Sequence, residues 1–436
     1  MNARQRTNWA GNIAFGAPDF YRPAAVPELQ ALVAKAGRIR VLATGHAFND
    51  MADSPGAQVS LAGLPPEVSV DSAARVARVA AGLSYAEVAV RLDAHGFALR
   101  NLASLPHISV AGATATATHG SGAANQNLAV AVAGLTLLTA DGDLLELSRG
   151  DDAFDGAVVH LGALGVVVSL VLDLVPSFDA SQRVYENLPL AALDDHFTDI
   201  MTAGYSVSLF TDWQAPRLTQ VWIKQRAGTP APSAASPASA PQAATPASSV
   251  TQASWFTATP ASGPRNPVPG ASPDACTEQL GVPGRWYERL PHFRPGFKPS
   301  AGDELQSEYL LPVASAVPAL HALDQIRDRI APVLRICEIR AIAADQLWLS
   351  SCYRQDSVAF HFTWIADTVA VLPVVGLVER QLGPFAPRPH WGKVFTATPQ
   401  ELAARYDRLP DFLNLMNRFD PSGKFRNAYT DRYLTG

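Results

Sequence analysis

Apolar positions in the first part of the chain alternate between helical and strand spacing. Helical spacing occurs over 27–36 and 84–95, and the second segment begins with Ser84 followed three residues later by Glu87, a capping box. A shorter helix is expected within 151–160. Branched or alternating apolar residues predict strands at 38–43, 75–81, 135–140, 144–148 and 166–175. These elements predict an α+β unit in which glycine-bearing turns follow the strands.

The second part of the chain repeats strand and helix patterns in longer segments. Strands are predicted at 206–212, 220–224, 304–312, 335–342, 358–364 and 391–396. Helical spacing occurs at 317–330, 366–382 and 410–419. This order favours a sheet with helices on one face.

A long segment between these parts carries no charge. No Asp, Glu, Lys or Arg occurs from 227 to 264, and up to about residue 253 the segment is almost entirely Ala, Ser, Pro, Thr and Gln. Such a composition buries too little apolar surface to offset the entropy lost on ordering. We expect a flexible surface loop at about 227–253, and an interaction motif is the alternative.

Composition and charge narrow the class of protein. With 436 residues, two or three domains are expected, and 48% hydrophobic residues supply a core. The net charge of −5 and the lack of a basic run argue against nucleic-acid and membrane-surface partners. The N-terminus shows no signal peptide, so a soluble, cytoplasmic protein is expected. Three cysteines without a CxxC pair favour neither disulfides nor zinc.

Glycine-rich turns are the first candidates for chemistry. They lie at 44–49, at 104–122 and around Gly162 and Gly165, and glycine lets backbone N–H groups approach a phosphate. None of them matches GxGxxG or the P-loop. Each turn alone fits a structural role, whereas three of them together favour a large phosphate-bearing cofactor. His46 and His119 are isolated, so no metal site is predicted.

Polar residues in the second part form another candidate site. Glu338 and Arg340 share one face of a predicted strand, as do His361 and Thr363 on the next, and Lys393 is predicted on a third. Charged residues inside a sheet are costly unless they are paired or functional. The cluster is therefore either a buried ion-pair network or a pocket for a ligand with many hydroxyls.

Several strings in the chain resemble one family of flavoproteins. They are Asn8-Trp9-Ala10, Thr44-Gly45-His46-Ala47-Phe48, residues 104–112, Thr118-His119-Gly120-Ser121-Gly122, residues 162–167, 281–284 and 305–309, His361-Phe362-Thr363-Trp364 and residues 390–395. They resemble the vanillyl-alcohol-oxidase-type flavoproteins, and within these the alditol oxidases (xylitol and sorbitol oxidases), which are relatives of the sugar-lactone oxidases.

The resemblance implies an α+β fold in three parts. Residues 1–178 would form a two-subdomain FAD-binding domain. Residues 179–400 would form a substrate domain with an antiparallel sheet covered by helices, and 401–436 would return to the FAD domain. FAD would be held by residues 42–48, that is Leu42, Ala43, Thr44, Gly45, His46, Ala47 and Phe48, and by Ser104, Ser109, Gly112, Thr116, Ala117, Thr118, His119 and Val167. His46 would be bonded covalently to the flavin, although the family's usual Gly-His-Ser is Gly-His-Ala here.

The resemblance also implies a substrate and a reaction. A polyol would meet Ser104, Glu338, Arg340, Thr363 and Lys393, with His361 beside them as a further catalytic residue. A terminal carbinol carbon would give a hydride to FAD, leaving an aldose, and O₂ would become H₂O₂. We expect a monomer without a metal. A sugar-1,4-lactone oxidase or dehydrogenase is the nearer alternative, and a flavin-loaded binding module without turnover is the other.

Overall fold

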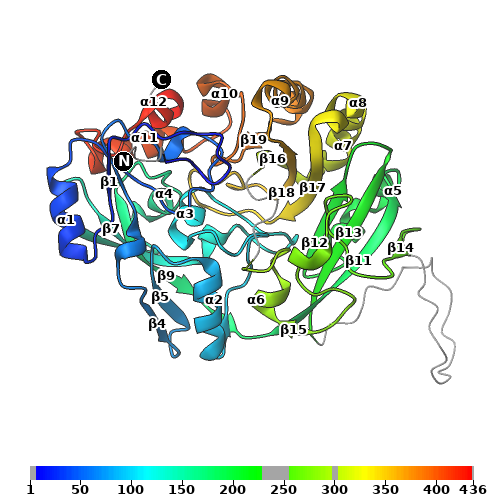
Figure 1. Cartoon of the computed structure of the whole chain (residues 1–436), viewed down its shortest axis with the longest axis horizontal. Helices are drawn as coiled ribbons and strands as arrows, with labels where there is room; N and C mark the ends of the chain where they lie inside the picture. The colour runs from blue at the N-terminus through cyan, green and yellow to red at the C-terminus, as the bar shows by residue number, and fades with distance from the viewer. Residues whose placement is uncertain (1–5, 228–254, 297–302, 435–436) are drawn as a thin grey trace, which may run out of the picture.

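Small sheets organise the N-terminal region of the chain, at the blue and cyan end of Figure 1. The computed structural model describes residues 6–227, 255–296 and 303–434. In a three-stranded sheet, β3 pairs in parallel with both β1 and β2. The bounds are Asp19–Tyr21 (β1), Val26–Lys35 (α1), Ile39–Val41 (β2) and Ala57–Val59 (β3). The predicted helix and strand at 27–43 are confirmed.

An antiparallel five-stranded sheet follows, in the order β4-β5-β9-β7-β8. Its strands and the neighbouring elements are β4 (Val68–Asp71), β5 (Val76–Ala80), α2 (Tyr85–Ala94), β6 (Phe97–Ala98), α3 (Val110–Ala115), β7 (Val132–Leu138), β8 (Leu144–Ser148), α4 (Phe154–Val158), β9 (Val166–Asp173) and β10 (Val175–Pro176). The capping box is present, since the Ser84 N–H donates to Glu87 Oε2 at 2.9 Å. The strands predicted at 135–140 and 144–148 pair as an antiparallel hairpin, with Gly142 at φ +91° in its turn.

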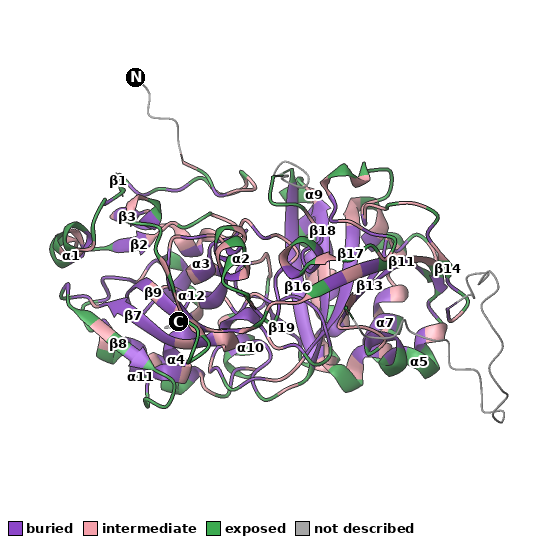
Figure 2. Cartoon of the chain, turned by 90° about the horizontal axis from the view of Figure 1, so that it is seen from below, coloured by how far each residue is buried: buried purple, intermediate pink, exposed green. Residues whose placement is uncertain are grey.

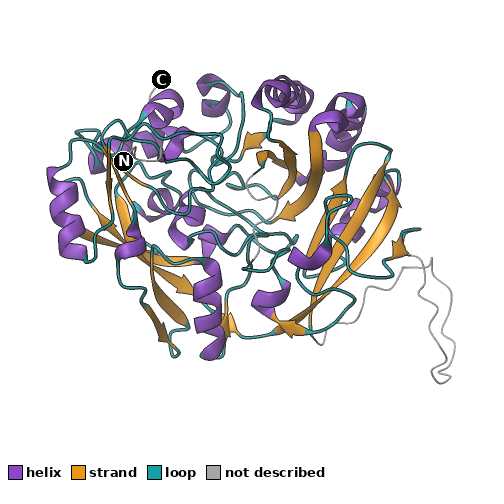
Figure 3. Cartoon of the chain, in the orientation of Figure 1, coloured by secondary structure: helices purple, strands orange, loops and turns teal. Residues whose placement is uncertain are grey.

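The rest of the chain builds a nine-stranded sheet (Figure 3). Its order is β14-β11-β13-β12-β17-β18-β16-β19, with β15 also paired to β11. The strands are β11 (Asp179–Pro189), β12 (Ser206–Thr211), β13 (Arg217–Arg226), β14 (Thr259–Pro260), β15 (Gly284–Arg285), β16 (Glu304–Pro312), β17 (Leu334–Ile342), β18 (Ser357–Ile365) and β19 (Arg388–Pro389).

Helices cover one face of this sheet, as the sequence predicted. They are α5 (Ala192–Met201), α7 (Ala316–Asp324) and α9 (Thr368–Leu382), and their apolar sides pack with the sheet into one core. Figure 2 shows the central strands of this sheet (β12, β16, β17 and β18) buried and the helices exposed on their outer sides. The other face of β16, β17 and β18 turns toward the N-terminal region. Short α6 (Trp286–Arg289) and α8 (Arg327–Ile330) complete this part.

The C-terminal helices pack on the N-terminal region. They are α10 (Pro399–Ala403), α11 (Leu409–Phe419) and α12 (Ala428–Leu434), and in Figure 1 α11 and α12 lie beside the first sheet. The Ile39 N–H donates to Lys424 O at 2.9 Å, and Lys424 Nζ donates to Val33 O at 2.7 Å. The boundaries at 178 and 400 stay predictions. The described residues include 3₁₀ turns at 50–52, 61–63, 128–131, 273–275, 313–315, 331–333 and 383–385.

Two sequence predictions about elements are wrong. The helix expected at 317–330 is interrupted at Ile326, where φ is −115° and ψ is 16°, so α7 and α8 are separate. The strand expected at 391–396, with Lys393 on it, is a loop. The backbone of this loop forms hydrogen bonds with two separate parts of the fold. Gly392 O accepts from the Phe48 N–H in the turn after β2, and the Val394 N–H donates to Gln306 O on β16. One hydrogen bond to each side cannot form a ladder.

The uncharged segment predicted as a loop at 227–253 lies outside the described residues, except for Ala227. Cys276, Cys337 and Cys352 are buried and form no disulfide. Within 6–227, 255–296 and 303–434, no helix has the length and apolarity needed to span a membrane, and no three His, Cys, Asp or Glu side chains gather as metal ligands.

Candidate active site

A cavity of about 510 Å³ lies where the N-terminal region faces the nine-stranded sheet. That volume is within the range of sites for small molecules and cofactors. Almost every residue predicted for FAD lines it, namely Leu42, Ala43, Thr44, Gly45, His46, Ala47, Phe48, Ser104, Ser109, Gly112, Thr116, Thr118, His119 and Val167. The exception is Ala117, whose side chain packs in the core of the N-terminal region. The predicted substrate residues Glu338, Arg340, His361, Thr363 and Lys393 line the same cavity.

The turn after β2 presents its backbone to the cavity. Gly45 has φ +69°, a conformation that favours glycine. The turn is held from outside, because Gly45 O accepts from the Trp9 N–H at 2.8 Å and Ala47 O accepts from Asn8 Nδ2 at 2.9 Å. Within the described part of the chain, the N–H groups of Thr44, Gly45 and Ala47 donate to no other residue. Unused N–H groups along a cavity wall suit an anionic cofactor group such as a pyrophosphate.

The second glycine-rich segment meets this turn. The Ser109 N–H donates to Thr44 Oγ1 at 3.3 Å, and Ser109 Oγ accepts from the Gly112 N–H at 3.3 Å. A Cβ on Gly112 would lie 2.6 Å from Ser109 Oγ, so a larger residue would displace the hydroxyl that accepts from the Gly112 N–H. Threonine hydroxyls at 116 and 118 bond each other at 3.1 Å. Small residues and free N–H groups therefore form a cradle that fits FAD.

His46 lies in the wall of this cradle between two rings. The Trp9 ring stacks on it with centroids 5.2 Å apart, and the His107 ring lies 4.7 Å away. These contacts fix the plane of the His46 imidazole beside the cavity.

Polar residues on three neighbouring strands form the opposite wall. In the register of the sheet, Glu338 on β17 pairs with His361 on β18, which pairs with Glu308 on β16. Two residues away from this pair along each strand, Gln306 on β16 pairs with Thr363 on β18. Because side chains alternate across a strand, these residues share one face, and they line the cavity together.

Arg340 lies between two carboxylates in this wall. It donates a hydrogen bond to Glu308 Oε1, and its Nε is 3.8 Å from Glu338 Oε2. Burial alone would raise the pKa of both carboxyl groups. Arg340, together with His292 at Glu338 and His119 at Glu308, outweighs burial and lowers the pKa of each. Arg340, Glu308 and Glu338 therefore form a buried ion-pair network, and the same network lines the cavity.

Lys393 enters the site from the loop after β19. Its Nζ donates to Gln306 Oε1 and lies 5.0 Å from the centroid of the Phe48 ring. Burial lowers the pKa of Lys393 to about 8, although Glu308 opposes the shift. His361 Nε2 is 3.2 Å from the same Gln306 oxygen, so it donates to it. Burial lowers the pKa of His361 to about 3, which leaves the ring neutral.

The structure adds three residues that sequence reasoning did not assign to the site. Glu308 and Gln306 lie on β16, and His292 lies in the loop after α6, with Nε2 2.8 Å from Glu338 Oε1. The alternation Glu304-x-Gln306-x-Glu308 in a predicted strand was a signal for the first two. His292 carries no comparable signal.

Two protein families match the parts of the chain that form this cavity. Residues 19–148 match the family described as FAD binding domain, and residues 303–433 match the family described as D-arabinono-1,4-lactone oxidase. An alditol oxidase from a Streptomyces species is 50% identical over 433 residues, which cover 99% of both chains. An L-gulono-1,4-lactone dehydrogenase from Mycobacterium tuberculosis is 27% identical, with 98% of both chains covered.

The fold has solved counterparts. A cholesterol oxidase from Brevibacterium sterolicum superimposes with a TM-score of 0.76 at 14% identity, over 99% of this chain and 96% of that one. A likeness at this identity concerns the fold, which is the α+β flavoprotein fold expected from the sequence.

Proposed function

The chain belongs to the alditol oxidase family of FAD-dependent oxidoreductases, and we propose that it oxidises the terminal hydroxyl of an open-chain polyol such as xylitol or sorbitol to an aldose. One observation carries the proposal. Glu338, Arg340 and Lys393 reach the cavity that the FAD-side turns line. Two cations and a carboxylate at one wall suit a ligand that presents several hydroxyl groups.

FAD is the cofactor, and His46 is the residue proposed to bind it covalently. The FAD-binding match to residues 19–148 contains His46, and its ring is held beside the cavity by Trp9 and His107. Bound FAD would supply the redox chemistry: the carbinol carbon gives up a hydride and its hydroxyl a proton, and O₂ finally takes the two electrons and two protons as H₂O₂.

The side chains of this chain provide orientation and charge. Arg340 and Lys393 stabilise the negative charge that develops on the reacting oxygen, and preorganised cations do this most strongly where water is excluded. Glu338 accepts hydrogen bonds from the neighbouring hydroxyls, while Ser104 and Thr363 bind further along the polyol. A site built to pair several hydroxyls discriminates strongly against analogues that lack them. His361 is neutral and acts as a hydrogen-bonding partner beside them.

A sugar lactone is the competing substrate, and the match of residues 303–433 to the lactone oxidase family favours testing it. Purified enzyme is offered xylitol, sorbitol and a γ-lactone, and H₂O₂ release is measured. We expect peroxide from the polyols and little from the lactone. Anaerobic loss of the oxidised flavin absorbance with xylitol tests the reductive step without O₂. Flavin that stays oxidised with every polyol would overturn the proposal.

A further inference from the structure

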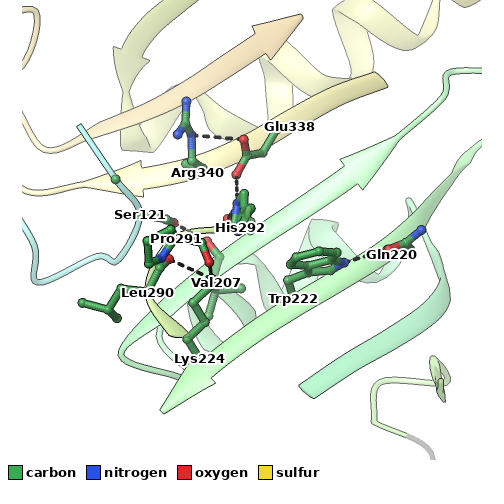
Figure 4. Close-up of polar contacts among 12 residues, drawn as sticks. Ser121, Val207, Gln220, Trp222, Lys224, Leu290, Pro291, His292, Glu338 and Arg340 are labelled. Atoms are coloured by element: carbon green, nitrogen blue, oxygen red, sulfur yellow. Dashed lines mark hydrogen bonds and ion pairs between the residues drawn. The ribbon is translucent and has the colours of Figure 1, made fainter. Parts of the chain in front are cut away.

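His292 is the hydrogen-bond partner of Glu338 in the cavity wall (Figure 4). Its Nε2 lies 2.8 Å from Glu338 Oε1, and both residues are buried. The other charged neighbour of Glu338, Arg340, has its Nε 3.8 Å from Oε2 and directs its hydrogen bond to Glu308. Among the described residues, His292 therefore provides the one side-chain hydrogen bond that Glu338 accepts.

A buried lysine holds the backbone that carries His292. Lys224 Nζ donates to the carbonyl oxygens of Arg289 at 2.7 Å, Leu290 at 2.7 Å and Pro291 at 2.9 Å, the three residues before His292. Burial lowers the pKa of Lys224 well below its usual value, but three carbonyl acceptors match the three donors of the ammonium form and favour it. Lys224 is 1% exposed, so this clamp is shielded from water.

Further contacts fix His292 itself. Its N–H donates to Ser104 O at 3.2 Å, and its O accepts from the Thr277 N–H at 2.9 Å. The ring meets Trp222 and Phe210 edge to face, with centroids 5.1 and 5.7 Å apart. The imidazole is thus held in one orientation before any ligand binds.

The hydrogen-bond partners determine where the ring proton lies. Burial lowers the pKa of His292 to about 4, and the Lys224 cation adds to the effect, so the ring is neutral. Glu338 is ionised beside Arg340, and a carboxylate only accepts hydrogen bonds. The single proton therefore lies on Nε2, while Nδ1 makes no hydrogen bond within the described residues.

We propose that His292 is a positioning residue for Glu338, whose carboxylate it orients toward the hydroxyls of the polyol through the Nε2–H bond. This proposal rests on the proposed polyol oxidation. Preorganisation of a binding group by a fixed neighbour lowers the cost of binding, so the effect belongs mainly in KM.

The test compares His292→Leu, which removes the donor, with His292→Gln, whose side-chain amide keeps an N–H at similar reach. With xylitol we expect His292→Leu to lower kcat/KM about tenfold, mostly through KM, and His292→Gln to stay within about threefold of wild type. His196→Leu, the same change at an exposed position, is the matched control and should behave as wild type.

A double-mutant cycle shows whether His292 acts through Glu338. In a Glu338→Ala background, His292→Leu should change kcat/KM less than about twofold, because the group that it orients has gone. Independent, multiplying effects would overturn the proposal, as would an unchanged KM in His292→Leu. If that variant does not fold, His292→Asn replaces it, since its shorter amide cannot reach Glu338. Equal KM values for His292→Asn and His292→Gln would then refute the assignment. Absence of polyol turnover in the wild type would instead refute the proposed function.

Discussion

Arg340 on β17 reaches across β18 to donate a hydrogen bond to Glu308 on β16. The two residues are 6% and 2% exposed, so the ion pair is sealed within the wall of the cavity. Glu308 also lies 3.2 Å from His119 Nε2, on a segment of the predicted FAD site. A single carboxylate thus connects the cation proposed to act on the polyol with the cofactor side.

Replacing Glu308 with Gln should impair both stability and catalysis. The amide oxygen still accepts a hydrogen bond from Arg340, but the charge that balances the guanidinium is lost. We expect the free energy of unfolding to fall by about 2 kcal/mol, the scale of a hydrogen bond to a charged group. The kcat/KM for xylitol should fall about tenfold as Arg340 loses its fixed direction. Urea unfolding and peroxide-coupled kinetics measure the two effects.

Glu146→Gln is the matched control for this change. Its carboxylate is exposed on β8 and pairs with Arg78 at 3.4 Å, so the same substitution there should alter neither quantity measurably. If Glu308→Gln were as stable and as active as Glu146→Gln, the pair with Arg340 would have no role in the site.

The sequence predicted most elements of this fold, and the reasons for the failures are physical. Glu304–Pro312 matches β16 at both ends, but eight of its nine residues are buried. A strand buried on both faces gives no inside–outside pattern, so the alternation Glu304-x-Gln306-x-Glu308 places these residues on one face without showing that this face lines the cavity. Lys393 was predicted on a strand because of its apolar neighbours, whereas hydrogen bonds to two separate parts of the fold hold it in a loop.

The site itself could be predicted only in part. Glu338 and Arg340 share a strand, and the resemblance to a known family supplied the residues of the FAD side. His292 was beyond reach, because its place beside Glu338 depends on the Lys224 clamp, which joins positions more than 60 residues apart. No local pattern encodes a contact of that kind.

His46 should carry FAD through a covalent bond. If so, flavin absorbance stays with the protein after precipitation in acid, and His46→Ala releases its flavin into the supernatant. The turn backbone and the other residues that line the cradle remain in that variant, so it should bind FAD reversibly before denaturation. A colourless pellet from the wild type would refute the covalent link and leave the FAD assignment intact.

The pH profile should show a basic limb from Lys393. Its pKa is lowered to about 8 by burial, so the cation that stabilises the reacting oxygen is lost as the pH rises through that value. We expect kcat/KM to fall above about pH 8, and Lys393→Arg, which stays charged, to lack this limb. Burial raises the pKa of Glu304, which also lines the cavity, to about 7. Glu304→Gln therefore removes an acidic limb, and because the Glu304 carboxylate raises the pKa of Lys393, it also shifts the basic limb to lower pH. A wild-type profile flat to pH 10 would contradict the role of the ammonium.

Lys393→Met and Arg340→Met should separate catalysis from stability. Both variants should lower kcat/KM by about 10² or more, because each removes a cation from the reacting oxygen. Arg340→Met leaves Glu308 and Glu338 buried without their shared cation, so the free energy of unfolding should fall by about 3–5 kcal/mol. Lys393→Met should cost little at pH 7, because Lys393 donates its hydrogen bond to the amide oxygen of Gln306 and to no carboxylate.

The free energy of unfolding should depend on pH differently in the wild type and in Lys393→Met. With a folded pKa of about 8 against an ordinary 10.5, Lys393 binds its proton less tightly in the folded state than in the unfolded state. Between these pH values the unfolded state still holds the proton that the folded state has lost, so stability rises with pH, by up to about 3 kcal/mol in the wild type. Lys393→Met has no such charge, so its curve should lack the rise. A Lys393→Met enzyme that melts much earlier than the wild type at pH 7 yet oxidises xylitol at a near-normal rate would show that Lys393 holds the fold and takes no part in the reaction.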